Sequence, residues 1–290
     1  MPLRRLLLSL TLLASGLPVQ AGLMQYGANE HQSQWQVEGD RLYCRLSHEI
    51  PIYGTAIFER RAGGDLGFRL EVLRQPREVA MARLVSAPPQ WKHETMTRDL
   101  GQVDIRVERA ALHLREPEAR RLLLELENGM FPTFSFSDWA DGRDEIEVAL
   151  SAVRVRAALG EFLQCLDDQL PYGFDDVRHS NVLFEFDKSE LTPTARRRLD
   201  AVAEYMLLDE EVALVLLEGR ADIRGWPGYN DALSERRVAS VRDYLAQQGI
   251  TDERFRIETR AYGERRPLAS NRTEEGRAQN RSVVVTLQGG

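Results

Sequence analysis

The spacing of apolar residues changes near the middle of the chain, and this change constrains the fold more than any other feature. Up to about residue 150, apolar and polar residues alternate one by one within short runs: 66–72, 103–107, 122–126 and 146–150. Such alternation is typical of half-buried antiparallel strands. Turn residues separate the runs: Gly63-Gly64-Asp65, Pro88-Pro89, Asn128-Gly129 and Asp141-Gly142. The pattern predicts an N-terminal all-β domain, either a sandwich or an open barrel.

Helical spacing appears beyond residue 150. Residues 153–168 show it first, and Leu170-Pro171-Tyr172-Gly173 is typical of a linker. Strands are then predicted over four segments: 180–186, 212–218, 255–262 and 282–287. Two helices are predicted between the first three strands, one capped by Thr192 and one capped by Asn230 or Asp231 and ending at Gly249. The order β-α-β-α-β-β predicts a sheet with both helices on one face, so the whole chain is expected to be an α+β protein.

The first residues resemble a secretory signal peptide. Arg4 and Arg5 precede a mainly apolar stretch over 6–13, and small residues lead to Ala21. This pattern predicts cleavage after Ala21 and export to the periplasm. An uncleaved anchor is the alternative, but the apolar stretch is shorter than the roughly 20 residues that a spanning helix needs. A lipid-modified N-terminus is not expected, because no cysteine lies near the cleavage site.

Composition narrows the class of ligand. The formal net charge is -7, which argues against a nucleic-acid partner. The five histidines are scattered and no Cys-x-x-Cys occurs, so neither a metal nor another cofactor is expected. The two cysteines are Cys44 and Cys165, and in an oxidising compartment a pair is more often bridged than free. The sequence thus predicts a disulfide that ties the start of the N-terminal domain to its end.

The C-terminal third resembles the OmpA-like peptidoglycan-binding domain. Motifs in family-like order carry the resemblance: Val182-Leu183-Phe184-Glu185-Phe186-Asp187, Gly219-Arg220-Ala221-Asp222, Tyr229-Asn230, Leu233-Ser234-Glu235-Arg236-Arg237, Tyr262-Gly263-Glu264 and Asn280-Arg281-Ser282-Val283. Several separated motifs agree over residues 182–285. The resemblance implies a domain that binds the diaminopimelate residue of the peptidoglycan stem peptide.

The resemblance also implies the ligand-binding residues. Diaminopimelate ends in an ammonium and a carboxylate on one carbon, which an acid and a guanidinium a few ångströms apart can bind. The family pattern assigns these roles to Asp222 and Arg237, with Asn230 as a hydrogen-bonding neighbour and Arg281 as a further candidate. The alternative for Asp222 and Arg237 is an ordinary surface ion pair, and for Arg281 a structural role. The family usually has His-Thr where this chain has Arg220-Ala221, so the extra cation is expected either to alter the edge of the pocket or to contact glycan or a partner.

The layout of the whole chain resembles the MotY family of flagellar motor proteins. The shared features are the signal peptide, a β-rich domain with one early and one late cysteine, and the join Pro171-Tyr172-Gly173-Phe174-Asp175-Asp176-Val177. The expected organisation is a signal peptide (1–21), a β-rich domain that associates with the basal body (22–170) and an OmpA-like domain (171–290). The resemblance implies a periplasmic protein that anchors the flagellar basal body to peptidoglycan and supports stator assembly and torque. Ring proteins, MotX and the stator complex are the implied partners.

Other classes of protein remain as alternatives. A general peptidoglycan-binding spacer of the cell envelope would need the same C-terminal domain without a motor role. A lipid-embedded barrel also alternates apolar and polar residues, although its strands run to about ten residues. A wall-modifying enzyme is disfavoured because no Gly-x-Ser-x-Gly, His-Glu-x-x-His or phosphate-loop motif occurs. A muramidase-type carboxylate pair leaves no such signature. The expectation is a protein that is not an enzyme.

Overall fold

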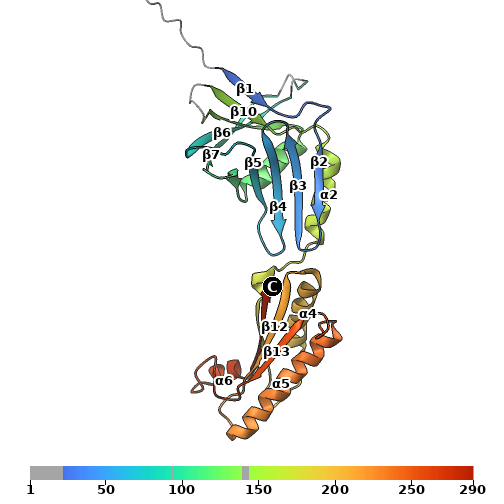
Figure 1. Ribbon diagram of the computed structural model, residues 1–290, viewed down its shortest axis with the longest axis vertical. Coiled ribbons are helices and arrows are strands. Elements are labelled where there is room, and N and C mark those ends of the chain that lie inside the picture. Colours follow the sequence, from blue (N-terminus) through green and yellow to red (C-terminus); the bar gives the residue numbers. More distant parts are fainter. Residues whose placement is uncertain (1–21, 90, 93–94, 139–143, 290) are drawn as a thin grey trace, which may run out of the picture.

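The computed structural model describes residues 22–89, 91–92, 95–138 and 144–289. Within these ranges the chain forms two sheets, each with its own hydrophobic cluster, and the two units lie end to end (Figure 1). The predicted signal peptide and the predicted turn at Asp141-Gly142 lie outside the described residues.

The N-terminal unit is built on one ten-stranded sheet in the order β1-β10-β9-β6-β7-β8-β5-β4-β3-β2. Its strands are β1 (Leu23–Tyr26), β2 (Trp35–Gly39), β3 (Tyr43–Ile50), β4 (Gly54–Arg61), β5 (Gly67–Val72), β6 (Ala80–Ala87), β7 (Arg98–Ile105), β8 (Ala110–Leu114), β9 (Phe131–Ser137) and β10 (Glu145–Ala149). Neighbouring strands pair antiparallel except β1, which pairs in parallel with β10. The sheet therefore ends at β1 and β2 and is open.

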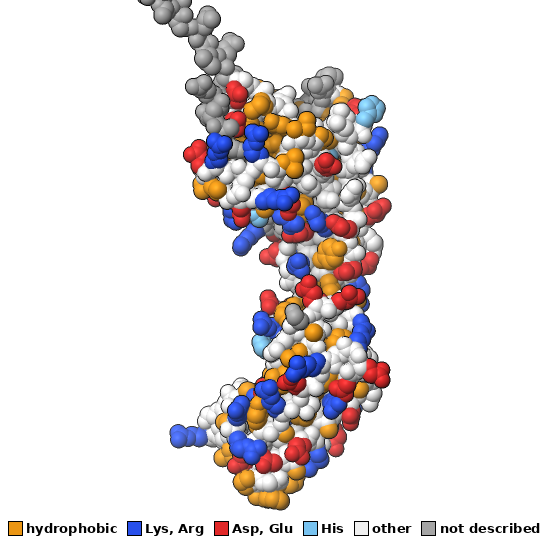
Figure 2. All heavy atoms as spheres, viewed as in Figure 1, with side chains coloured by type: hydrophobic (Ala, Val, Ile, Leu, Met, Phe, Trp, Pro, Cys, Tyr) orange, Lys and Arg blue, Asp and Glu red, His pale blue; other side chains and the backbone are white. Residues whose placement is uncertain are grey.

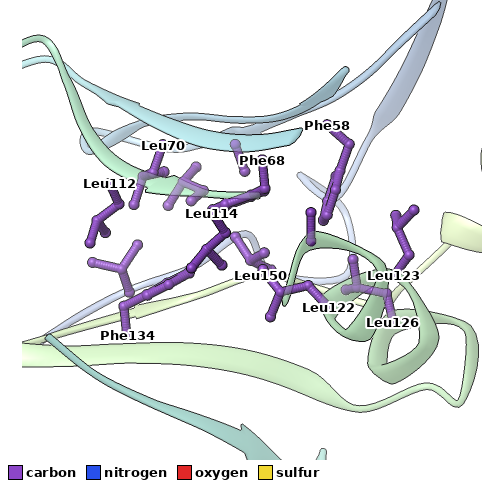
Figure 3. Close-up of a cluster of buried hydrophobic side chains, with 14 of the residues drawn as sticks. Phe58, Phe68, Leu70, Leu112, Leu114, Leu122, Leu123, Leu126, Phe134 and Leu150 are labelled. Atoms are coloured by element: carbon purple, nitrogen blue, oxygen red, sulfur yellow. The ribbon is translucent and has the colours of Figure 1, made fainter. Parts of the chain in front are cut away.

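This sheet curves around a single core. The rings of Phe68 on β5 and Phe134 on β9 stack with their centroids 5.8 Å apart, although β6, β7 and β8 lie between these strands in the sheet. Figure 3 shows both rings in one cluster with leucines from the helix α1 (Glu118–Glu127). Of the two predicted arrangements, an open barrel is the one that the sheet adopts.

The strand predicted over residues 122–126 is wrong, because these residues belong to α1. Leu122, Leu123 and Leu126 are buried at helical spacing, whereas Leu124 is 50% exposed. A run of three leucines fits either period, and the burial of two adjacent ones is incompatible with a half-buried strand. The N-terminal unit is consequently not all-β.

The predicted helix over residues 153–168 is confirmed as α2 (Val155–Asp168), which packs on β2 and β3. The predicted disulfide is confirmed as well. It joins Cys44 on β3 to Cys165 on α2, with the two Cα atoms 6.0 Å apart and a sequence separation of 121 residues. The bridge fixes the second helix against the edge of the sheet.

The C-terminal unit has four strands in the order β11-β14-β12-β13. They are β11 (His179–Leu183), β12 (Val212–Gly219), β13 (Arg256–Ala261) and β14 (Ser282–Gly289), and the helices are α3 (Phe174–Val177), α4 (Pro193–Leu208), α5 (Pro227–Gln247) and α6 (Glu274–Asn280). The strands β12 and β13 are parallel, and β14 is antiparallel to both β11 and β12. The predicted order of the four strands and two long helices is confirmed.

The helices α4 and α5 pack side by side, and their buried residues join one hydrophobic cluster with alternate residues of β12, including Val215 and Leu217. Both helices thus cover one face of the sheet, as predicted. Thr192 caps α4 by accepting a hydrogen bond from the backbone N–H of Ala195. The predicted cap of α5 is wrong: that helix begins at Pro227, because proline suits a first helical position that needs no N–H donor.

Contacts at the junction of the two units come from both sides. The backbone N–H of Leu170 donates to the carbonyl of Arg41, and Arg41 forms a 2.7 Å ion pair with Glu204 on α4. Tyr172 donates a hydrogen bond to the same glutamate. Among the described residues, no helix has the length and apolarity to cross a membrane.

Candidate functional site

The candidate site lies where two segments of the C-terminal unit meet. Asp222 lies in the segment between β12 and α5, and Arg281 lies between α6 and β14. Their side chains form an ion pair in which Arg281 Nη1 and Asp222 Oδ2 are 3.0 Å apart. Both are nearly buried, with 5% of the Asp222 side chain and 11% of the Arg281 side chain exposed. The structure therefore brings together the predicted acid and the arginine that the sequence ranked as a further candidate.

Asp222 and Arg281 each form a further hydrogen bond besides the ion pair. The second carboxylate oxygen of Asp222 accepts a hydrogen bond from the backbone N–H of Arg224 at 3.0 Å. Arg281 Nη1 also donates to Glu274 Oε1 at 3.1 Å. The buried Nε of Arg281 has no hydrogen-bond partner among the described residues. One donor of Arg281 is therefore unpaired among the described residues.

Arg237 has a different environment. It is fully buried on α5, and its guanidinium lies 5.2 Å from the centroid of the Phe184 ring. Its three nitrogens donate to backbone carbonyls: Nε to Lys188 at 2.9 Å, Nη1 to Arg220 at 3.0 Å and Nη2 to Glu185 at 3.3 Å. Arg237 thereby ties the segment after β11 to the segment after β12.

Burial lowers the pKa of Arg237 to about 10, well below its ordinary value, because the charged guanidinium is removed from water. The charge of Asp222 opposes this shift, whereas that of Arg281 adds to it. The side chain stays protonated at neutral pH. Asp222 thus lies in the field of two arginines, but its hydrogen bond is to Arg281.

Asn230 is buried in the first turns of α5 and donates from Nδ2 to Glu264 Oε2 at 2.6 Å. Its amide oxygen faces Gly225, where an added Cβ would lie 3.2 Å away. Asn230 therefore links the start of α5 to the segment after β13. Among the described residues, its side chain forms no hydrogen bond with Asp222.

Arg220 stands where the OmpA-like pattern usually has histidine, and it is buried. It donates to the carbonyls of Arg266 at 2.9 Å and Glu218 at 3.0 Å, and its guanidinium lies 5.3 Å from the centroid of the Tyr262 ring. These partners hold the cation on the side of β13.

Glu274 is a site residue that the sequence did not single out. Its carboxylate accepts from Arg277, Arg281 and Arg224, and the hydrogen bond from Arg277 is the largest cause of the lowered pKa of this group. Thr273 caps α6 by accepting from the N–H of Gly276. The run Thr273-Glu274-Glu275 is a helix-start signal, so the helix and its acidic first turn could have been recognised.

The described residues contain no group of three or more His, Cys, Asp or Glu side chains that could hold a metal ion. The chemistry available at the site is that of paired opposite charges in a nearly dry setting. Such a pair suits recognition of a ligand that carries both charges.

Comparison with known proteins identifies the family. The family profile named MotY N-terminal domain matches residues 26–171, and that of the OmpA family matches residues 183–281. The chain is 34% identical to the sodium-type flagellar protein MotY of Vibrio parahaemolyticus over 91% of its own length and 90% of that protein's.

Other relatives match only the C-terminal part. Outer membrane protein A of Bordetella avium is 43% identical over 39% of this chain and 57% of that protein. The crystal structure of the peptidoglycan-associated lipoprotein from Burkholderia pseudomallei is 30% identical, with a TM-score of 0.35, and covers 37% of this chain and 89% of that one. Because the likeness to MotY extends over nearly the full length of both chains, this protein belongs to the MotY family and carries an OmpA-family domain in its C-terminal part.

Proposed function

We propose that this chain is a non-enzymatic, periplasmic component of a bacterial flagellar motor that binds peptidoglycan. In this proposal residues 1–21 direct export, residues 22–170 associate with ring proteins of the basal body, and residues 171–290 hold that assembly to the cell wall. The anchored ring then supports assembly of the stator, which generates torque against it. MotX is a further partner in this proposal. Family membership across both parts of the chain supports the motor role.

The observation that carries the binding role is the ion pair between Asp222 and Arg281. The free amino-acid end of diaminopimelate has an ammonium and a carboxylate on one carbon. It can therefore become the ionic partner of Asp222 and of Arg281 at the same time, in place of their bond to each other. Its carboxylate accepts from the guanidinium of Arg281, and its ammonium donates to Asp222. Each charge thereby exchanges one partner for another, which limits the cost of keeping it nearly buried.

Arg237 and Asn230 support this exchange from behind. Arg237 fixes the two segments that flank the pair through its hydrogen bonds to Lys188 and Arg220. Its charge also favours a bound carboxylate. Asn230 holds the segment after β13 through Glu264. In this proposal both residues keep the site in shape, and Arg281 makes the closest contact with the ligand.

Binding to purified sacculi tests the first half of the proposal. Asp222→Asn keeps an oxygen that can accept from Arg281 but removes the charge that would pair with the ligand ammonium. We expect the mature variant to stay folded at the assay temperature, with a lower melting temperature than the wild type, and to lose at least about thirtyfold in affinity, since unpaired charges of this kind cost about 2–5 kcal/mol. The matched control is Asp167→Asn, an exposed acid on α2. Equal co-sedimentation of both variants would refute the binding role.

Swimming of a deletion strain tests the motor half. A non-motile strain with intact filaments, restored by the wild type and not by Asp222→Asn, is the expected result. Normal swimming after deletion, together with Asp222-dependent binding to sacculi, would instead indicate a general spacer of the cell envelope.

A further inference from the structure

Large hydrophobic side chains are exposed around the candidate site. Phe186 and Ile223 are each 52% exposed, and Trp226 is 68% exposed. Figure 2 shows hydrophobic side chains gathered at the lower end of the C-terminal unit, where α5 begins. Single exposed apolar residues are ordinary, but several large ones beside a charged pair mark a surface that contacts something else.

The indole of Trp226 is held against the first turn of α5. A Cβ added at Gly228 would lie 2.6 Å from Cζ3 of the indole, so the ring occupies the space that a side chain at this position would need. The Tyr229 ring lies beside it, with centroids 6.3 Å apart, and the Tyr229 hydroxyl donates to Asp187. The ring is thus supported on one side by backbone and a neighbouring aromatic, while most of its surface stays open to solvent.

Hydrogen bonds and ring contacts connect these aromatics to the charged pair. The guanidinium of Arg224 lies 5.5 Å from the centroid of the Phe186 ring and donates to Glu274, which also binds Arg281. The backbone N–H of the same arginine donates to Asp222. Trp226 is only four positions after Asp222 in the chain, so their Cα atoms are at most roughly 14 Å apart. A ligand of a few linked residues could therefore contact both.

We propose that Trp226, with Tyr229 beside it and Phe186 connected to the same surface through Arg224, forms a platform for the sugar rings of the glycan whose stem peptide binds at Asp222 and Arg281. The inference rests on the proposed function and adds a second, saccharide-binding subsite to it. A pyranose ring presents an apolar face of C–H groups that fits an open aromatic face, and its hydroxyl and acetamido groups project at the edges. Trp and Tyr suit such amphipathic ligands because they combine a large apolar surface with a polar tip.

The arginines around the rings complete the match. The guanidinium of Arg236 lies 5.6 Å from the centroid of the Tyr229 ring, and Arg224 lies over Phe186. Guanidinium groups donate in several directions and accept nothing, so they suit hydroxyl and carbonyl oxygens at the edge of a stacked sugar. An aromatic surface with nearby arginines also suits a lipid headgroup region, and this second occupant is separated by the experiment.

The test compares two probes on the full mature chain: a disaccharide–peptide released from peptidoglycan, and the same diaminopimelate-containing peptide without sugars. We expect Trp226→Ala to weaken binding of the disaccharide–peptide about two- to tenfold and to leave binding of the free peptide unchanged. Trp226→Phe should retain most of the affinity. Trp91→Ala is the matched control, because Trp91 is 56% exposed on the N-terminal unit.

Gly228→Ala gives an independent variant. Alanine favours the helix but its Cβ displaces the indole, so we expect wild-type or higher thermal stability together with the same selective loss for the disaccharide–peptide. Equal affinities of wild type and Trp226→Ala for both probes would overturn the platform, and so would an equal loss for both. Trp226-dependent binding to anionic lipid vesicles without any preference for the disaccharide–peptide would also overturn it. Asp222→Asn separates the two proposals, because wild-type binding of both probes by that variant refutes the peptide site itself.

Discussion

Asp222 and Arg281 form a nearly buried ion pair although 59 residues separate them in the chain. Arg237, which the family pattern pairs with Asp222, instead donates to three backbone carbonyls. The two arginines therefore have different tasks. Arg281 forms an ion pair with a carboxylate, whereas Arg237 holds the backbone segments beside that pair.

This difference predicts that Arg237→Ala destabilises the fold. The substitution removes the Arg237 donors from the carbonyls of Lys188, Arg220 and Glu185, and of these Glu185 still accepts from the backbone N–H of Lys188, so we expect the free energy of unfolding to fall by about 2–4 kcal/mol. Urea unfolding of the mature chain measures the change. Arg198→Ala, on the exposed face of α4, should stay within about 0.5 kcal/mol of the wild type. Similar unfolding of the two variants would contradict the structural role of Arg237.

The disulfide should contribute to stability because it closes a long loop. The bridge between Cys44 and Cys165 spans 121 residues, and removing a bridge of this kind costs about 2–5 kcal/mol. We expect the double serine variant to melt at a lower temperature than the wild type. Reductant should lower the melting temperature of the wild type but not that of the variant. Identical melting of oxidised and reduced wild type would argue against this contribution.

Local patterns predicted much of the C-terminal unit. The cap at Thr192 and the dense apolar run of β12 each depend on neighbouring residues, so the sequence shows them directly. The disulfide was predictable because only two cysteines exist and the compartment favours pairing. The extent of the N-terminal sheet and its curvature depend on pairing between distant strands, such as β1 with β10, which no local pattern records.

The errors have identifiable causes. The leucines of α1 fit two periods, and only their burial distinguishes a helix from a strand. Asn230 has the chemistry of a helix cap, but it lies inside α5, where its buried side chain donates a hydrogen bond to Glu264 in the segment after β13. The ligand-binding roles of Arg237 and Arg281 stay predictions, and the ion pair of Asp222 with Arg281 depends on tertiary packing that the motif does not record.

The burial of His48 leads us to expect that the stability of the folded chain falls in mild acid. The ring is fully buried and stacks on Trp35 with centroids 4.5 Å apart, Nδ1 lies 2.9 Å from the carbonyl oxygen of Gln34, and Nε2 has no hydrogen-bond partner among the described residues. Burial lowers the pKa of His48 below its ordinary 6.5, because protonation would place an unpaired charge in the core.

The sign follows from the lowered pKa. Below pH 6.5 the unfolded chain takes up a proton that the folded chain refuses, so the free energy of unfolding decreases as the pH falls from 6.5 toward the folded-state pKa. The slope from this residue reaches at most about 1.4 kcal/mol per pH unit. Denaturant unfolding between about pH 5 and 7.5 should show the decrease in the wild type and a smaller one in His48→Gln, each relative to its own value at pH 7.5. Parallel pH profiles of the two proteins would contradict this prediction.

The junction between the two units depends on a close approach of two backbone segments. A Cβ at Gly173 would lie 2.4 Å from the carbonyl oxygen of Ala62, and one at Gly63 would lie 2.3 Å from the backbone nitrogen of Gly173. Because the obstructing atoms are backbone, Gly173→Ala must move one segment away from the other. We expect a loss of about 1–3 kcal/mol in stability and a broader distance distribution in small-angle scattering.

Gly160→Ala is the matched control for the junction, because an added Cβ at this position in α2 meets nothing within 4 Å. That variant should scatter like the wild type and match or exceed its stability. Binding of the free diaminopimelate peptide should be unchanged in Gly173→Ala, since α5 begins at the end of the C-terminal unit away from this junction (Figure 1), and Asp222 shortly precedes that helix. Scattering and melting of Gly173→Ala that superimpose on those of Gly160→Ala would show that the close approach does not fix the two units relative to each other.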